Sequence, residues 1–361
     1  MHRPGPGGGG PASGCANVTC MNPRPGPRIT SPADFLALVP TALGFHPEES
    51  LVLVAIGGEV GDLHARVDLP ADDEDEIEEV MQVLLGAVTR ARAWLVAVIA
   101  YAEEAYPAEE VVDVLLERLA EVDVDVLCAI RADGERWFSL DRTSVDCPEE
   151  GVPYDLSSHP ITLEAVLDGR VTYESRRELE GSLMCADVDA VQAVEQAAEE
   201  AVRRFEAAAR DGLGMECPQG ARAHLMTEGY WLRQRIRRYV QTREPLDHDE
   251  VGRLLAAVLS VDVRDVAWAE MTRADARTHV ELWRDVVRRT PPDLLSAPAA
   301  LLAFAAWLAG EGALAWCAVE RCQQVDPDYS MAALVSQALA AAIHPSTWQP
   351  FPAEDLPLFA G

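Results

Sequence analysis

The hydrophobic pattern of this chain changes near Cys185, and this change constrains the fold more than any other feature of the sequence. Between Ile29 and about Leu183, apolar runs of strand length alternate with segments of helical periodicity. Beyond Cys185, the periodic segments have apolar residues at helical spacing alone. We therefore predict an α/β domain, with helices packed on a mixed sheet, followed by an all-α domain.

Both ends of the first predicted helix are marked in the sequence. Ser31 can cap the helix, Pro32 suits its first position, and Asp34 can complete a capping box. The helix should end or kink near Pro40, which lacks an N–H group, and stop at Gly44.

Apolar runs predict strands, and glycine-containing turns join two pairs of them into hairpins. The first turn is Gly57–Gly61, and the second contains Asp133 and Gly134. Because helices separate other strands, the predicted sheet is mixed. The predicted elements are the strands Leu51–Ile56 and His64–Leu69, the helix Glu74–Arg90, the strand Trp94–Tyr101, the helix Ala108–Glu121, and the strands Val124–Arg131 and Glu135–Leu140.

The second half is predicted to be a series of short helices, with a glycine-rich hinge at Gly212–Gly220. We expect residues 1–28 to be a disordered Gly/Pro-rich leader, 29–184 the α/β domain, 185–348 the helical domain and 349–361 a Pro-rich tail. The predicted helices are Asp187–Arg210, Ala221–Thr242, His248–Leu259, Arg264–Met271, Ala274–Arg289, Pro298–Ala309, Gly312–Val325 and Asp328–Ile343.

A long motif at the start of the first half resembles a known family. The motif is carried by Ser31, Pro32, Ala33, Asp34, Leu36, Pro40, Leu43, Gly44, Phe45, Pro47, Ser50, Leu51 and Val52. It is similar to the opening of the actinobacterial domain-of-unknown-function family 4192, and the runs Cys147–Pro153 and Ala306–Ser330 are similar to later parts of that family. The resemblance transfers no catalytic residue, since none is established for the family.

The last helices also resemble one 34-residue tetratricopeptide repeat. Small residues at these positions would let two helices pack closely, and a single repeat must stack on its neighbours to bury its apolar face. Because such arrays usually form binding surfaces, this resemblance implies a protein partner for the helical domain. The positions that match are Leu302, Ala303, Gly310, Ala315, Cys322 and Pro327.

Charge and composition exclude several classes of function. The net charge of −30 opposes binding to phosphate backbones and anionic lipid, so a nucleic-acid partner is not expected. All 30 basic residues are arginine. Without lysine the chain cannot build a P-loop, a pyridoxal Schiff base or the active site of a protein kinase, and we expect no cofactor.

The eight cysteines contain no C-x-x-C pair, so no metal site is predicted. Reduced thiols, an N-terminus without an apolar signal-peptide core and the lack of a long uncharged apolar run together predict a cytoplasmic protein that does not bind membranes.

Five residues are candidates for a site. His46 lies just before the predicted strand Leu51–Ile56 and could be a general base, although it also suits a solvent-exposed turn. Cys147 could be a nucleophile, but its acidic neighbours would raise a thiol pKa, and a packing role is the alternative. Arg170, Arg176 and Arg177 could bind a small anion bidentately, or pair internally with Asp and Glu.

Two clusters of charged residues are further candidates for a binding site. Asp247–Glu250 reads as a helix cap with first-turn carboxylates and not as a metal cluster. Arg233, Arg235, Arg237 and Arg238 form a basic cluster that could bind single-stranded nucleic acid, or dock against acidic helices of the same chain.

The sequence favours a non-catalytic binding or adaptor protein. One alternative is an enzyme of unrecognised type, a hydrolase or transferase acting on an anionic small molecule at a site built from His46, Cys147 and the arginines. A second alternative is a nucleic-acid-associated protein that uses the basic cluster.

Overall fold

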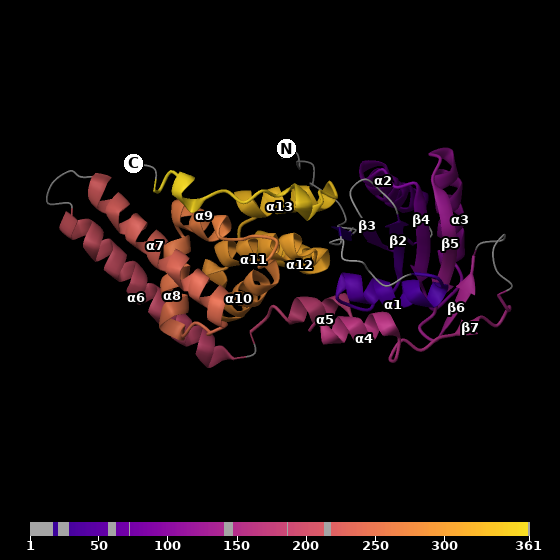
Figure 1. The fold of residues 1–361 in the computed structure, drawn as a ribbon, viewed down its shortest axis with the longest axis horizontal. Coiled ribbons are helices and arrows are strands. Elements are labelled where there is room, and N and C mark those ends of the chain that lie inside the picture. Colours follow the sequence, from indigo (N-terminus) through magenta and orange to yellow (C-terminus); the bar gives the residue numbers. More distant parts are fainter. Residues whose placement is uncertain are drawn as a thin grey trace, which may run out of the picture.

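The computed structural model describes residues 17–20, 29–56, 63–71, 73–140, 147–185, 187–212 and 218–359. Within these residues, a mixed sheet with packed helices occupies the first half of the chain, and helices alone follow it, as the sequence predicts (Figure 1). The predicted turn at Gly57–Gly61 and most of the predicted hinge at Gly212–Gly220 lie outside the described residues.

The sheet has seven strands in the order β1-β3-β2-β4-β5-β6-β7. The pair β4–β5 is parallel, and the other five pairs are antiparallel. Both predicted hairpins, β2–β3 and β5–β6, are therefore confirmed. The strands are β1 (Asn17–Cys20), β2 (Ser50–Ile56), β3 (Leu63–Asp68), β4 (Leu95–Tyr101), β5 (Asp125–Ala132), β6 (Arg136–Ser139) and β7 (Val152–Pro153).

Helices cover both faces of the sheet. On one face, Leu53 and Val98 belong to an apolar cluster with α2 (Glu74–Ala91) and α3 (Ala108–Glu121), the crossover between the parallel strands. On the other face, alternate residues of the same strands pack with α1 (Pro32–Leu43). Because both faces are covered, β2 and β4 are apolar almost throughout, as the unbroken runs in the sequence predicted.

The first helix has the predicted cap. Ser31 is its N-cap, and the Asp34 carboxylate accepts from the backbone N–H groups of Thr30 and Ser31 at 2.7 and 2.8 Å. The helix continues through Pro40 and ends at Gly44, which has a φ of 80°. In that left-handed conformation glycine carries no steric cost, so Gly44 stops the helix as predicted.

The second half is a bundle around α11, whose side chains are buried on nearly every side. Helices α10, α12 and α13 surround it, together with α8 and α9 (Figure 1). The helices of this half are α6 (Val188–Gly212), α7 (Pro218–Thr242), α8 (His248–Val258), α9 (Val261–Ala269), α10 (Ala276–Arg289), α11 (Ser296–Ala309), α12 (Gly312–Gln323) and α13 (Ser330–Ala340).

Four elements differ from the sequence prediction. Within the expected leader, β1 pairs with β3 at the edge of the sheet, so these four residues are ordered as a strand. The short strand β7 and the helix α5 (Arg176–Gly181) were not predicted, because each is too short to show a period. The sequence indicates a helical stretch at Leu163–Leu167, and the helix α4 (Pro160–Leu167) starts three residues before it.

The two halves of the chain contact each other directly. The edge strand β1 lies against α12 and α13, and α5 lies against α12. The Arg176 guanidinium on α5 binds the Glu320 carboxylate on α12 at 2.7 Å. Arg90 at the end of α2 donates to the backbone carbonyl of Ala340 on α13 at 3.0 Å.

Candidate functional site

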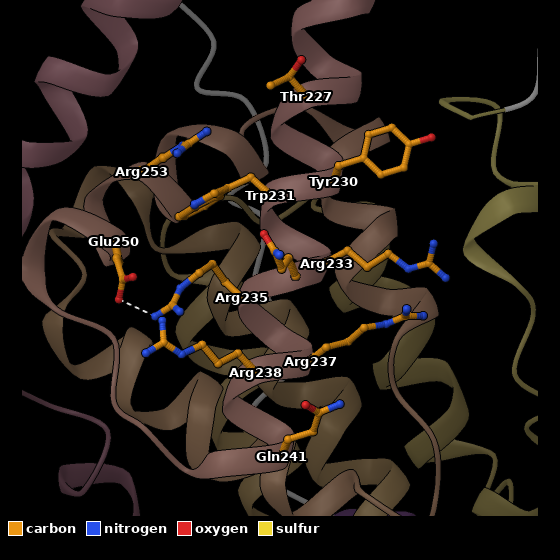
Figure 2. Close-up of a pocket in the computed structure, with 11 residues that line it drawn as sticks. Thr227, Tyr230, Trp231, Arg233, Arg235, Arg237, Arg238, Gln241, Glu250 and Arg253 are labelled. Carbon is orange, nitrogen blue, oxygen red and sulfur yellow. Dashed lines mark hydrogen bonds and ion pairs between the residues drawn. The ribbon is translucent and has the colours of Figure 1, made fainter.

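An open groove of about 990 Å³ lies along α7 and beside α8 in the helical half (Figure 2). Its lining is unusually rich in arginine and includes two aromatic rings. The lining residues are Thr227, Tyr230, Trp231, Arg233, Gln234, Arg235, Arg237, Arg238, Gln241, Glu250 and Arg253.

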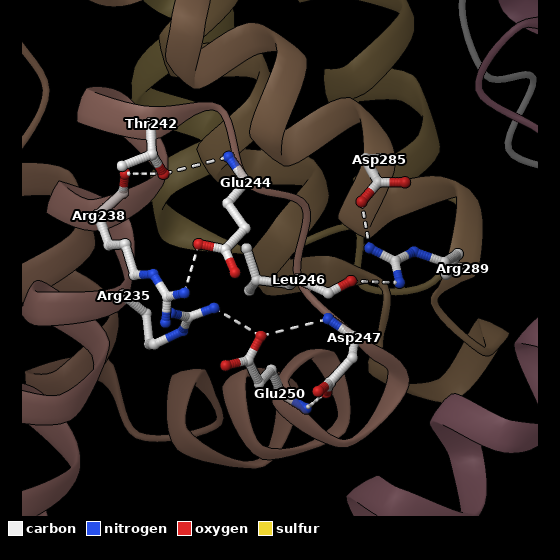
Figure 3. A network of polar contacts seen from close by, with 9 residues as sticks. All are labelled: Arg235, Arg238, Thr242, Glu244, Leu246, Asp247, Glu250, Asp285 and Arg289. Carbon is white, nitrogen blue, oxygen red and sulfur yellow. Dashed lines mark hydrogen bonds and ion pairs between the residues drawn. The ribbon is translucent and has the colours of Figure 1, made fainter.

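The helix α8 is held in place by a capping box at its start. The Asp247 carboxylate accepts from the backbone N–H of Glu250 at 2.8 Å, and the Glu250 carboxylate accepts from the backbone N–H of Asp247 at 3.2 Å (Figure 3). The predicted cap at Asp247 is thus confirmed. This geometry also fixes the Glu250 carboxylate at the edge of the groove.

Two arginines of α7 bind carboxylates on the α8 side of the groove. Arg235 donates to the Glu250 carboxylate at 2.5 Å, and Arg238 pairs with Glu244 in the loop between the helices (Figure 3). Thr242 fixes this loop, because its hydroxyl accepts from the backbone N–H of Glu244 at 3.2 Å. These pairs join the end of α7 to the start of α8.

Two further arginines of α7 point to its other side. Arg233 and Arg237 both bind the Glu270 carboxylate, at 2.7 and 2.5 Å. Arg233 also binds Glu354, near the C-terminus, at 2.7 Å. The hydrogen bonds that the Arg233 guanidinium donates to Glu354 and to Glu270 raise the pKa of Arg233, which stays charged.

The two aromatic residues of the groove, Tyr230 and Trp231, lie at its end nearer the start of α7 (Figure 2). The Arg253 guanidinium lies 4.1 Å from the centre of the Trp231 ring, a cation–π contact. The same guanidinium donates to both oxygens of Glu228 at 2.9 and 3.0 Å. The side chain of Tyr230, which precedes Trp231 on α7, is more than half exposed.

Each arginine of the groove therefore forms an ion pair with at least one carboxylate, but the arginines differ in solvent exposure. Arg233 and Arg235 are 15% and 9% exposed, whereas Arg237 and Arg238 are 52% and 50% exposed. Exposed ion pairs contribute about 0–1 kcal/mol and can exchange partners at little cost. The outer guanidiniums can thus accept a carboxylate from another molecule.

The sequence-predicted candidates lie elsewhere. His46 is exposed in the turn after α1, and its backbone N–H donates to the carbonyl of Tyr173 at 2.9 Å. The loop that carries His46 therefore meets the segment of Arg170 and Arg176. Cys147 is half-buried beside β6, the third strand from β2 in the sheet order, with its sulfur 3.9 Å from the carbonyl oxygen of Trp137.

His159, the histidine nearest to Cys147 in the sequence, pairs with Asp34 instead. Its Nε2 lies 3.2 Å from the Asp34 carboxylate, while its Nδ1 accepts from the backbone N–H of Ile161 at 3.3 Å. Both ring nitrogens are thus engaged in capping contacts at the starts of α1 and α4. In this geometry the ring is not placed to activate the Cys147 thiol.

The three candidate anion-binding arginines have different surroundings. Arg176 binds Glu320 and Glu180, at 2.7 and 3.2 Å, as the internal-pairing alternative describes. Arg170 lies 4.0 Å from Asp168, and Arg177 is exposed on the first turn of α5. Binding of an anion by these residues stays a prediction.

Within the described parts of the chain, no group of three or more His, Cys, Asp or Glu residues is placed to hold a metal ion. Burial raises the pKa of both Cys317 and Cys322 to about 12, so these two thiols are poor nucleophiles. Among the helices that the structure describes, none combines the length and the apolar character needed to cross a bilayer.

Comparison with known proteins gave one match. The sequence model of a family described as a domain of unknown function, DUF4192, matches residues 32–346. Neither the curated proteins nor the solved structures gave a match.

Proposed function

The chain belongs to the DUF4192 family, and from this premise we propose that it is a non-catalytic binding protein whose α7 groove takes an acidic segment of a partner protein. The observation that carries the proposal is the groove itself, which gathers five arginines and two aromatic side chains on one open surface. The proposal also includes a cytoplasmic location, in line with the thiols predicted to be reduced.

The binding step would be an exchange of carboxylates. An incoming glutamate or aspartate would replace Glu244 at Arg238, or share Arg237 with Glu270. Arginine favours this exchange because its planar guanidinium offers several donors to one carboxylate. Apolar side chains of the same segment would cover Tyr230 and the Trp231 ring, adding burial that a carboxylate alone lacks.

A protein segment suits this surface better than a nucleic acid. A single strand carries one phosphate per nucleotide and would meet the field of a chain with a net charge of −30. A peptide with two or three carboxylates among apolar residues meets much less repulsion. The repeat-like pair α11–α12, which resembles a tetratricopeptide hairpin, supports a helical half that presents surfaces to proteins.

The enzyme alternative has weaker support. His46 lies between α1 and β2, whereas Cys147 lies beside β6, the third strand from β2 in the sheet order. A catalytic pair needs hydrogen-bond reach, or one bridging water.

The test is a titration of peptides against matched variants. A fluorescein-labelled peptide that combines glutamate, leucine and phenylalanine is the probe, and the same peptide with glutamine for glutamate is its control. The double variant Arg237→Gln, Arg238→Gln should bind the acidic peptide about tenfold more weakly, a change of about 1.4 kcal/mol. The double variant Arg203→Gln, Arg204→Gln changes two exposed arginines on α6 and should bind normally.

Two results would count against the proposal. The first is equal binding of the acidic and the glutamine peptides by the unmodified protein. The second is tight binding of a labelled single-stranded oligonucleotide, with steep salt dependence, in the absence of peptide binding, which would assign the groove to nucleic acid.

A further inference from the structure

The C-terminal segment of residues 352–359 lies along the side of α7 that carries Tyr230 and Arg233 (Figure 2). It contains one turn of 3-10 helix, Ala353–Asp355, and little other regular structure. Its side chains Ala353, Leu356 and Leu358 are nonetheless buried. The segment is thus bound to the helix by specific contacts, in the way that a short peptide is bound by a larger protein.

The polar contacts hold the segment at two points. The Glu354 carboxylate binds the Arg233 guanidinium at 2.7 Å. The Arg222 guanidinium, three turns earlier on α7, donates to the backbone carbonyl of Pro357 at 3.1 Å. Together they fix the direction of the segment along the helix, with its end toward the start of α7.

The apolar contacts require a glycine on the helix. Gly229 has no side chain, and a Cβ atom there would lie 2.8 Å from Leu358 and 3.1 Å from Phe359. The Phe359 ring also packs on Tyr230, with 4.6 Å between the ring centres. The gap at Gly229 is therefore a shallow apolar recess that receives the last two apolar side chains of the segment.

We propose that this face of α7 is a docking site for a linear segment of a partner protein, and that the chain's own C-terminal segment occupies it in the absence of the partner. The partner segment would carry a carboxylate for Arg233, followed four and five residues later by a leucine and an aromatic residue for the recess at Gly229. This is the spacing of Glu354, Leu358 and Phe359.

The chemistry of the contacts supports exchange. The Glu354 side chain is 64% exposed, and its partner Arg233 belongs to α7 and not to the segment. A carboxylate from another chain can therefore reach the same position. Because the chain's own segment is tethered, it competes at an effective concentration that reaches the millimolar range for short linkers. A partner must therefore offer more contacts than the segment does, which would restrict binding to partners that also reach the neighbouring groove.

The experiment compares the full chain with a chain that ends at Phe351. Phe351 is kept because its ring packs on Trp268 and Trp348 within the bundle. A fluorescein-labelled peptide of residues 352–359 is titrated into each by fluorescence anisotropy. The shortened chain should bind the peptide, and the full chain should bind it at least tenfold more weakly. Peptides with Glu354→Gln or Phe359→Ala should each lose about tenfold in affinity for the shortened chain.

A second variant keeps the full length. The changes Leu358→Asp and Phe359→Asp should free the site without removing residues, so this chain should bind the unmodified peptide as the shortened chain does. Adding Gly229→Ala should abolish that binding, whereas Gly220→Ala, in open space on the same helix, should not change it.

Three outcomes would overturn the inference. If the peptide binds neither variant while both are folded by circular dichroism, the face is not a docking site. If both variants unfold, the segment is an integral part of the helical core. If the full chain forms dimers that disappear on shortening, the occupant is a second copy and not a partner. The groove variant Arg238→Gln changes an arginine that pairs with Glu244 and not with this segment, so its effect on the acidic peptide distinguishes a failure here from a failure of the proposed function.

Discussion

At the scale of single residues, Gly252 shows how closely the helices of the second half approach each other. A Cβ atom at this position would lie 2.4 Å from the Cβ of Ala197 and 2.6 Å from the backbone nitrogen of Ala198. Backbone atoms of a helix cannot move aside without displacing the whole helix. Gly252 therefore sets the distance between α6 and α8.

We predict that Gly252→Ala lowers the free energy of unfolding by about 1–3 kcal/mol, the usual cost of overpacking a core. Urea unfolding followed by circular dichroism measures the change. Gly220→Ala is the matched control, because it places the same methyl group on a helix with nothing within 4 Å. Alanine favours the helix over glycine, so the control should be neutral or slightly stabilising. Equal effects of the two changes would contradict the packing argument.

His64 is a second residue whose surroundings set a measurable property. It lies on β3 opposite Val54 of β2, fully buried, and neither ring nitrogen has a hydrogen-bond partner in the described residues. Burial lowers the pKa of this imidazole to about 4, from an ordinary value of 6.5. The folded protein thus holds the ring neutral, while the unfolded chain takes up a proton as the pH falls.

The stability contributed by the neutral His64 ring is present above pH 6.5 and is lost as the pH falls toward 4. Between pH 7 and pH 5 this loss should be about 2 kcal/mol. Because other groups also titrate, the test is the difference between the unmodified protein and His64→Leu, measured by urea unfolding at both pH values. The variant should lose about 2 kcal/mol less than the unmodified protein over this range. Parallel pH curves would show that the ring takes up its proton at the same pH in the folded protein as in the unfolded chain.

At the scale of elements, helices and strands could be predicted from the sequence where the apolar pattern extends over many residues. Helix caps could be predicted where the capping side chain contacts the helix that it precedes. Ser31 and Asp247 are such caps, and both are confirmed. Short elements such as β7 and α5 could not be predicted, since their position depends on neighbours that are distant in the sequence.

The candidate groove could be predicted in part. The spacing of four between Arg233 and Arg237 places both on one side of a helix, where they share Glu270. Arg235 and Arg238, three apart, share the other side. The internal ion pairs agree with docking against acidic residues of the same chain. Glu270 and Glu354 could not be identified as partners, because the fold alone brings residues so far apart together.

Asp34 illustrates how one side chain can stabilise two elements. Its carboxylate accepts four hydrogen bonds from Thr30 and Ser31 at the start of α1, and it also binds His159 at the start of α4. Burial raises the pKa of the Asp34 carboxyl, but the hydrogen bonds from Thr30 and Ser31 outweigh this effect and lower it overall. The charged form is therefore the one that the fold favours, and its contribution is lost as the pH falls through the lowered value.

We predict that Asp34→Ala costs about 2 kcal/mol, the upper end of the range for a lost helix cap. Thermal unfolding at pH 7 measures it. Asp73→Ala is the comparison, since Asp73 caps α2 through two backbone N–H groups, and both of these hydrogen bonds lie within its own helix. Its loss should cost about 1 kcal/mol. A larger effect at Asp73 than at Asp34 would show that the contact with α4 contributes nothing.

At the scale of the whole molecule, the two halves share one apolar core. The cluster that contains Val52 and Ile99 of the sheet, with Leu36 of α1, continues without a break to Leu301 of α11 and Leu314 of α12. The polar contact between Arg176 and Glu320 lies at the same junction. The change of pattern near Cys185 therefore marks a change of secondary structure, while the packing across it is continuous.

This continuity predicts how the protein unfolds. Two domains with separate cores would melt in two steps, whereas halves that share a core lose their packing together. We expect one transition in differential scanning calorimetry, with the ratio of van't Hoff to calorimetric enthalpy near one. Arg176→Gln should lower the single melting temperature by a few degrees, since a partly buried ion pair joins the halves. Arg203→Gln, at an exposed pair on α6, should leave it unchanged. Two resolved transitions, with Arg176→Gln shifting one of them alone, would show that each half folds around a core of its own.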